Sequence, residues 1–292
     1  MKIRFLSLIL ALTMLAGYAG VARAEAAPVE LECFLIKVEA LDVEEQIAAK
    51  FKEEYPNVTI RFVATPDAET ALFARIAAND VPDIMNTYPA EVVYRKMMDD
   101  GLFVDLTGND MFKTVPESTQ KLSAYNGKQY ALPLAMSSYG VFYNKDIFAK
   151  YGLTPSTDYK GFLDLCQKLK DAGEQPLEFY DKSAGGVGQM AERLTGILNS
   201  DSNALFQKVA SGETDLTKEP EIRTLAETLL KIREFGQKDQ LGTDLDQVVA
   251  DFIAGRTAMF IGGTWNVATI LKANKDLNFA MFQFPNPMGT GE

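Results

Sequence analysis

Gly255–Val267, with the sequence Gly-Arg-Thr-Ala-Met-Phe-Ile-Gly-Gly-Thr-Trp-Asn-Val, is the most informative stretch of the chain. We expect a helix to end at Gly255 and a short buried strand to follow over 258–261. A glycine turn then leads to Trp265, the only tryptophan. A strand that ends in glycines before a lone large ring is typical of an aromatic side chain at a pocket wall, but tryptophan is also common in cores. The local sequence leaves both interpretations open.

The N-terminal half alternates between strand and helix patterns. A strand is predicted over 31–36, and a helix follows in which Val43, Ile47 and Phe51 share one face. The residues 58–62 then alternate between apolar and polar side chains, as a strand does. The resulting β-α-β unit implies a parallel strand pair with a right-handed crossover. The order continues with a helix over 68–78, a strand over 83–85 and a helix over 91–99, which indicates an α/β sheet.

The remaining segments are predicted from turns and apolar faces. Asn126-Gly127 is a hairpin signal, because both residues tolerate the positive φ of a tight turn. Asn144 is placed to open a helix. We expect strands over 130–134, 140–143 and 279–282, and helices with apolar faces within 162–169, 222–232 and 248–252. The last strand runs into a Pro- and Gly-rich tail, so we expect a C-terminal truncation.

The N-terminus is predicted to be an export signal. Lys2 and Arg4 precede an apolar run over 5–15 that is too short to span a bilayer, and Ala22-Arg23-Ala24 fits the cleavage rule. Residues 1–24 are therefore assigned to a signal peptide. Tyr18 stands where a lipoprotein box needs a cysteine, so we expect a soluble protein in the periplasm or at the outer face of the membrane.

Composition excludes several kinds of chemistry. The formal net charge is −11 and the chain contains no histidine. The negative charge argues against nucleic-acid and anionic-membrane partners. Without histidine, the usual Ser-His and Cys-His dyads and the His-containing zinc sites are ruled out. Cys33 and Cys166 are expected to be small buried hydrophobic residues, although a disulfide between them stays open.

No catalytic, cofactor or metal motif stands out. Gly185-Gly186-Val187-Gly188 lacks both the dinucleotide fingerprint and the Lys-Ser/Thr of a P-loop, so we expect a surface loop or the rim of a ligand site. Carboxylates are plentiful, but no run of sequence marks a pair for hydrolysis. We therefore expect no enzyme activity, no cofactor and no metal, with a secreted glycosidase as the less favoured alternative.

Two segments together carry a specific resemblance. The segments Tyr130–Asp146 and Phe252–Trp265, the second fitting the pattern F-x-x-G-x-x-A-M-x-x-x-G-x-W, resemble the bacterial extracellular solute-binding proteins of family 1. The motif Val81-Pro82-Asp83-Ile84 adds a third match in the same order. This family contains the maltose- and multiple-sugar-binding proteins that serve ABC importers.

The resemblance implies a two-lobed periplasmic-binding-protein fold of type II-like topology, in which each lobe is a mostly parallel sheet flanked by helices. The expected N-terminal lobe comprises 25–135 plus 285–292, and the C-terminal lobe, incomplete, comprises 136–284. Such a protein is a monomer that captures a sugar or oligosaccharide in an interlobe cleft by hinge closure and delivers it to membrane permease subunits. The alternative ligands are a polyol, glycerol phosphate, a polyamine or a peptide.

The resemblance also assigns candidate ligand contacts. Trp265 is the expected sugar-stacking platform, because an indole face covers the C–H face of a sugar ring. The two residues that flank it, Thr264 and Asn266, are candidates for hydrogen bonds to sugar hydroxyls. The further candidates lie in loops that follow predicted strands or in the segment that crosses between lobes: Lys37, Glu39, Tyr88, Glu91, Ser137 and Ser138.

Overall fold

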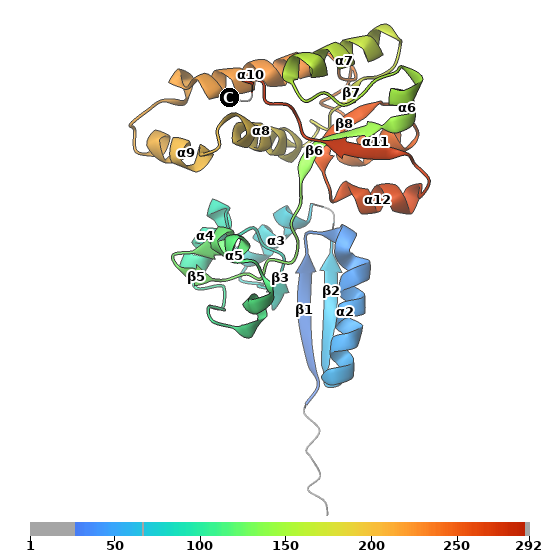
Figure 1. Cartoon of the computed structure of the whole chain (residues 1–292). Coiled ribbons are helices and arrows are strands. Elements are labelled where there is room, and N and C mark those ends of the chain that lie inside the picture. Colours follow the sequence, from blue (N-terminus) through green and yellow to red (C-terminus); the bar gives the residue numbers. More distant parts are fainter. Residues whose placement is uncertain (1–26, 66, 290–292) are drawn as a thin grey trace, which may run out of the picture. The chain divides into compact units, whose positions relative to one another are not determined.

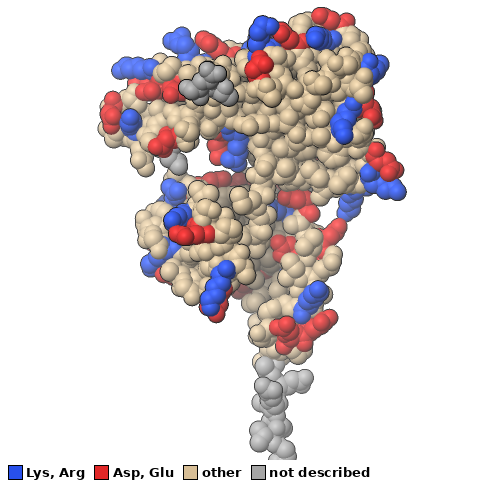
Figure 2. Space-filling model, in the orientation of Figure 1, with Lys and Arg blue, Asp and Glu red and all other residues tan. Residues whose placement is uncertain are grey.

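The computed structural model describes residues 27–65 and 67–289, and the described chain divides into two compact units between Pro133 and Leu134 (Figure 1). The predicted signal peptide lies outside the described residues. On the face of the molecule drawn in Figure 2, basic and acidic side chains are interspersed on the surface of both units. None of the helices in the described ranges has the length and hydropathy of a membrane span.

The sheet of the first unit is parallel throughout. Its central strand is β1 (Val29–Leu35), with β2 (Val58–Ala64) on one side and β3 (Ile84–Met85) on the other. Two crossover helices connect them, α2 (Leu41–Glu54) and α3 (Ala68–Ala77). The β-α-β prediction is confirmed, and its parallel strands bring the loops that follow β1, β2 and β3 to one edge of the sheet.

The rest of the first unit is a helix-rich segment closed by a hairpin. It contains α4 (Val92–Asp99), a 3₁₀ turn at Asp110–Thr114, α5 (Glu117–Ser123) and the hairpin of β4 (Ala124–Tyr125) and β5 (Lys128–Gln129). Asn126 and Gly127 have positive φ angles of 49° and 73°, as the predicted turn requires.

The strand predicted over 130–134 is wrong, because this segment has no regular structure in the described chain. Pro133 has no N–H to donate to a strand partner, which removes one ladder hydrogen bond from any strand at this position.

Helix α2 has an apolar face that is largely exposed. Val43, Ile47 and Phe51 share one face, as the sequence indicated, but they are 57%, 58% and 37% exposed. The helix contains no buried residue. Amphipathic spacing therefore predicted the helix and its apolar face correctly, whereas spacing alone does not say how completely a partner covers that face.

The second unit is built on a mixed sheet in the order β7-β8-β6-β9. The strands are β6 (Tyr139–Asn144), β7 (Leu177–Glu178), β8 (Met259–Gly263) and β9 (Phe279–Phe282). Only the β7–β8 pair is parallel, because β6 runs antiparallel to both of its neighbours. The expectation of a mostly parallel sheet is corrected here. Strands β8 and β9 are separated in the sequence by helix α12. In the sheet they are not neighbours, because β6, which comes much earlier in the chain, lies between them.

The described part of the second unit contains seven helices. They are α6 (Lys145–Lys150), α7 (Tyr159–Asp171), α8 (Ala184–Leu198), α9 (Ser202–Ala210), α10 (Pro220–Arg233), α11 (Leu245–Ile253) and α12 (Asn266–Ala273). The glycine-rich run at 185–188 lies in the first turns of α8 and is not a loop, because Ser183 caps the helix by accepting a hydrogen bond from the Gly186 N–H.

Strand alternation separates two apolar cores in the second unit. Val141 of β6 and Met259 of β8 point into the larger core, with side chains of α7, α8 and α10. Phe142 and Phe260 point to the other face, where their rings stack at 4.6 Å between centroids and pack with α11 and α12. Both faces of the sheet are therefore buried, which fixes the direction of every side chain on β8.

The end of the described chain belongs to the second unit. Phe284 is buried in its larger core, and the Asn286 side chain donates a hydrogen bond of 3.1 Å to the Ile197 carbonyl. The sequence-based division had placed 285–292 with the first lobe, and the structure differs for 285–289. A proline-rich segment gives no periodic pattern from which its packing partner can be read.

Both cysteines are buried free thiols, one in each unit. Burial raises the pKa of Cys33 to about 11 and that of Cys166 to about 12. Both thiols are therefore protonated at neutral pH and are poor nucleophiles and poor metal ligands.

Candidate functional site

The first group of candidate residues lies at the corner where β8 turns into α12. Trp265 is the residue immediately before α12. Asn266 is buried, and its side-chain amide donates a 3.0 Å hydrogen bond to the Gly263 carbonyl. The structure thus gives Asn266 a role within the corner itself, since this hydrogen bond closes the turn that carries Trp265.

The Trp265 side chain is partly exposed and lies beside another aromatic ring. The centroids of Trp265 and Tyr139 are 6.1 Å apart, with 40° between their planes. The Tyr139 hydroxyl lies 3.2 Å from the hydroxyl of Tyr180, which is buried. Burial raises the pKa of Tyr139 and of Tyr180 above the ordinary value, so both remain neutral. The hydroxyl pair fixes the Tyr139 ring next to the indole.

Two hydrogen bonds join the corner to the segment before β6. The Thr264 N–H donates to the Ser138 carbonyl at 2.9 Å, and the Ser138 N–H donates to the Thr264 hydroxyl at 3.1 Å. Ser137 and Ser138 are exposed, while Thr264 is partly buried. The structure therefore brings Ser138 to Thr264 and Trp265, although Ser138 and Thr264 are 126 positions apart in the sequence.

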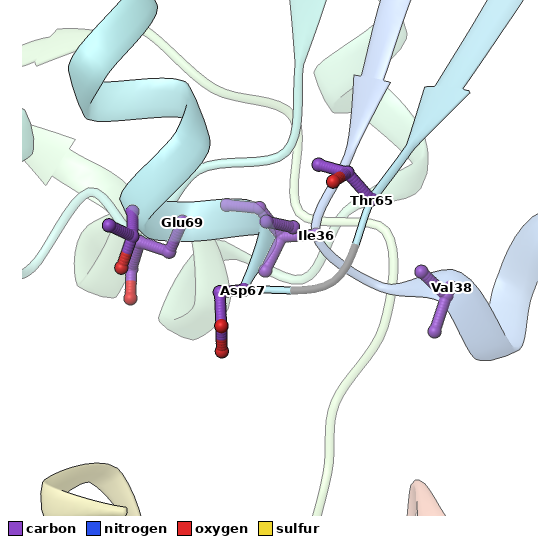
Figure 3. A pocket seen from close by; sticks show the side chains of 7 residues that line it. Ile36, Val38, Thr65, Asp67 and Glu69 are labelled. Atoms are coloured by element: carbon purple, nitrogen blue, oxygen red, sulfur yellow. The ribbon is translucent and has the colours of Figure 1, made fainter.

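A hollow of about 420 Å³ lies in the first unit, and its lining residues include none of the predicted candidates Lys37, Glu39, Tyr88 and Glu91 (Figure 3). Its lining comes from the loops that follow β1 and β2 and from the first turn of α3. The lining residues are Ile36, Val38, Thr65, Asp67, Ala68, Glu69 and Thr70. Asp67 has a left-handed φ of 49°, which Asp tolerates better than most residues.

Two carboxylates, Asp67 and Glu69, line this hollow. Glu69 accepts a 3.1 Å hydrogen bond from the Tyr94 hydroxyl, and the Tyr94 ring lies 6.1 Å from that of Tyr88. Burial raises the pKa of Tyr88, and the negative charges of Glu69, Glu39 and Glu91 raise it further. Three of the predicted candidates, Glu39, Tyr88 and Glu91, are therefore close enough to interact electrostatically.

The loop that carries Lys37 is shaped by an amide side chain. The Asn86 Oδ1 atom accepts hydrogen bonds from the N–H groups of Ile36, at 3.0 Å, and Lys37, at 3.2 Å. Asn86 follows β3 and the two donors follow β1, so this side chain ties two neighbouring loops at the same edge of the sheet. Lys37 itself is partly buried.

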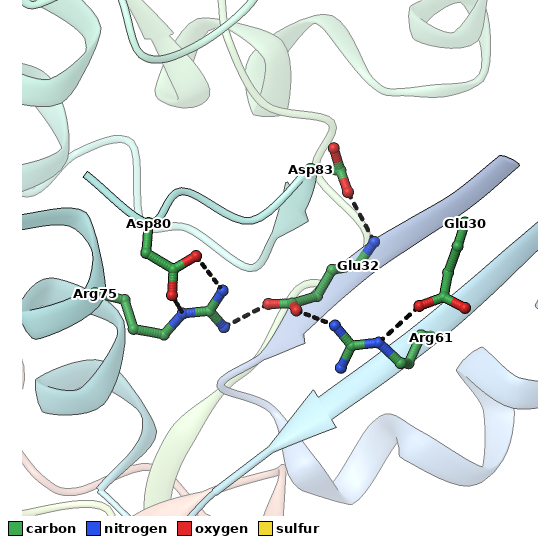
Figure 4. A network of polar contacts seen from close by, with 6 residues as sticks. All are labelled: Glu30, Glu32, Arg61, Arg75, Asp80 and Asp83. Carbon is green, nitrogen blue, oxygen red and sulfur yellow. Dashed lines mark hydrogen bonds and ion pairs between the residues drawn. The ribbon is translucent and has the colours of Figure 1, made fainter. Parts of the chain in front are cut away.

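An ion-pair network anchors α3, and with it one wall of the hollow (Figure 4). Arg75 of α3 forms ion pairs with Asp80, at 2.8 Å, and with Glu32 of β1. Glu32 also pairs with Arg61 of β2, and its N–H donates to Asp83 at 2.9 Å. A carboxylate that is only 15% exposed thus joins α3 to two strands.

Sequence reasoning missed Thr65, Asp67 and Glu69 at the hollow, and Tyr139 at the indole. The first three follow β2. Because the carboxyl ends of neighbouring parallel strands meet at one edge of a sheet, the loop after β2 lies beside the loop after β1, which carries Lys37 and Glu39. The candidates after β1 therefore pointed to the loop after β2 as well. Tyr139 lies beside the indole because β6 pairs with β8. This pairing cannot be read from the order of the elements in the sequence.

A second hollow, of about 360 Å³, lies between Asp181 and the loop 238–241 in the second unit. Its strongest polar groups already bind each other, because Arg233 makes two hydrogen bonds to the Asp181 carboxylate, at 2.8 and 3.0 Å. Both side chains are largely buried. We therefore do not include this hollow in the candidate site. No group of three or more metal-ligating side chains with a suitable arrangement occurs within 27–65 and 67–289.

The sequence is similar to those of proteins described as sugar-binding proteins. The chain is 26% identical over 264 residues to the multiple sugar-binding protein of Streptococcus mutans, an alignment that covers 88% of this chain and 62% of the relative. It is 28% identical over 151 residues to the melibiose/raffinose/stachyose-binding protein MelE of Bacillus subtilis, covering 49% and 34%. The chain thus spans about three fifths of the length of the first relative.

Solved structures share the fold. The binding protein RafE in complex with raffinose superimposes with a TM-score of 0.77 at 26% identity, covering 89% of this chain and 68% of that one. A chitin oligosaccharide binding protein gives 0.74 at 23% identity, covering 90% and 68%, which supports the fold alone. These relatives are binding proteins by description, not enzymes.

The family model for the bacterial extracellular solute-binding proteins matches residues 40–290. This match begins after β1 and includes β2, β3, the segment that enters β6 and the β8–α12 corner. The chain is a member of the family of bacterial extracellular solute-binding proteins.

Proposed function

We propose that this chain is the substrate-binding component of an ABC importer and that it captures a neutral sugar or oligosaccharide without chemical change. The observation that carries the proposal is the partly exposed indole of Trp265 beside Tyr139, held at a fixed corner of the sheet. Burying roughly 80 Å² of apolar contact against such a ring contributes on the order of 2 kcal/mol. This free energy corresponds to roughly thirtyfold in affinity.

The polar half of the proposed site is the hollow of the first unit. Sugar hydroxyls donate hydrogen bonds to carboxylates such as Asp67 and accept them from donors such as the Thr65 hydroxyl. The carboxylates Asp67 and Glu69 at the hollow disfavour an anionic guest. This charge favours a neutral guest over glycerol phosphate, one of the alternatives that the sequence left open.

Transport then follows from the two groups of contacts. A sugar that binds contacts in both units favours the conformation in which both groups reach it, and hinge closure of periplasmic binding proteins is an established example of this motion. In our proposal the permease subunits respond to that conformation. The exported location and the monomeric state, expected from the sequence, belong to the same proposal.

Isothermal titration calorimetry tests the ligand class. The titrants are raffinose, stachyose and diacetylchitobiose, with trigalacturonate as the anionic control. We expect saturable binding of at least one neutral sugar and none of the control. The proposal fails if no neutral sugar binds, or if trigalacturonate binds more tightly than every neutral sugar.

A further inference from the structure

We propose that Gly263 is a positioning residue for the candidate site. It leaves empty the place on β8 where a side chain would stand, and the indole of Trp265 occupies that place. The use of the ring as a sugar platform depends on the function proposed above. The placement of the ring by Gly263 does not depend on it.

The evidence is the space around the missing side chain. A Cβ atom added at Gly263 would lie 2.0 Å from Cζ3, 2.1 Å from Cη2 and 2.3 Å from Cε3 of Trp265. All three atoms belong to the six-membered ring of the indole. Carbon atoms that are not bonded prefer separations of about 3.5–4.0 Å, so no side chain at 263 is compatible with the present position of the ring.

Strand register explains why the ring lies there. Gly263 is the direct partner of Tyr139 in the antiparallel β6–β8 pair. Directly opposed residues project from the same face of a sheet, with their Cβ atoms only about 4.5–5.5 Å apart. The Tyr139 ring therefore lacks a cross-strand neighbour from residue 263 itself. The indole takes that position from two residues further along the chain, 6.1 Å from the Tyr139 ring.

The backbone on either side of Trp265 is fixed by the contacts already described. Thr264 is hydrogen-bonded to Ser138, and the Asn266 amide is bonded to the Gly263 carbonyl. These bonds leave the Trp265 side-chain torsions as the adjustable elements of the corner. Gly263 is not among the glycines with positive φ, so alanine fits its backbone, and the nearest atoms that its Cβ would meet are those of the indole.

The first test is Gly263→Ala in the full chain, with Gly188→Ala as the matched control. Gly188 lies on α8 with open space around its Cβ position. Because Trp265 is the only tryptophan, fluorescence excited at a wavelength that tyrosine does not absorb reports on this ring alone. We expect red-shifted emission, stronger quenching by acrylamide and at least about tenfold weaker raffinose binding in Gly263→Ala, and no change in the control. Wild-type emission and quenching in folded Gly263→Ala would overturn the inference.

A second measurement needs no folded variant at position 263. In wild-type protein, the α-protons of Gly263 lie close to the indole and should show a ring-current shift in NMR spectra, which Trp265→Leu removes. Unshifted α-protons in the wild type would overturn the inference. If Gly263 is shifted but no sugar binds, the positioning role stands and the proposed function fails, so the two failures are distinguishable.

Discussion

At the scale of single residues, Glu178 has an unusual environment. It lies on β7 with 7% exposure, and its Oε2 atom has no hydrogen-bond partner. Burial, and then the neighbouring Asp251 carboxylate, raise the pKa of Glu178 to about 7, although Arg256 opposes the shift. The folded state therefore holds this proton more tightly than the unfolded chain does.

The pKa of Glu178 predicts how stability depends on pH. The raised pKa of Glu178 contributes to the unfolding free energy. This contribution is fully present below the unfolded pKa of about 4.5 and is lost as pH rises through the folded pKa of about 7. At pH 8 the ionised group is expected to cost on the order of 3 kcal/mol of unfolding free energy. Glu178→Gln removes this cost, so its stability relative to wild type should rise between pH 4.5 and 8 in urea titrations.

The matched control is Glu227→Gln, an exposed carboxylate on α10. The difference between this variant and wild type is the reference against which the difference for Glu178→Gln is compared at each pH. If Glu178→Gln behaves like this control, the Glu178 carboxyl group is solvated or paired, contrary to the structure.

At the scale of elements, short helices depend on their caps. Helix α6 is six residues long, and the buried Asn144 before it accepts hydrogen bonds from the N–H groups of Asp146, at 3.0 Å, and Ile147, at 3.1 Å. Without this acceptor, both donors lose their partner at the end of β6. Asn144 thus stabilises the junction between the central strand and the helix that follows it.

We predict that Asn144→Ala lowers the unfolding free energy by about 1–2 kcal/mol, measured by urea denaturation with circular dichroism. Asn144→Ser keeps a capping oxygen and should recover part of the loss. Equal stability of Asn144→Ala and wild type would show that the cap does not contribute.

Elements with strong local signals could be predicted from the sequence. The β1-α2-β2 unit, the Asn126-Gly127 hairpin and the β8 strand lie within a few residues of their predicted positions. Each of these depends on periodicity or on backbone angles that few residues adopt. The sequence also marked Trp265 as a candidate ligand contact. The structure places this residue, partly exposed, just after the end of β8.

Features that depend on pairing between distant segments could not be predicted. The insertion of β6 between β8 and β9 makes the second sheet mixed, and no local pattern encodes which strand lies between two others. The Tyr139–Trp265 contact follows from that same register. The half-exposed face of α2 is a further case, because apolar spacing does not say what covers a helix.

At the scale of the whole molecule, the two units offer complementary kinds of contact. The second unit presents an aromatic surface, and the first presents a hollow lined by polar and acidic side chains. A sugar has both an apolar ring face and a rim of hydroxyls, so it can use both. We propose that binding requires contacts from each unit.

The most direct test is the raffinose affinity of wild type, Trp265→Ala and Asp67→Gly, measured by calorimetry in the full chain. Glycine at 67 tolerates the positive φ that Asp67 adopts. We expect each substitution to weaken binding by at least about tenfold, with circular dichroism unchanged. Wild-type affinity in either folded variant would contradict the claim.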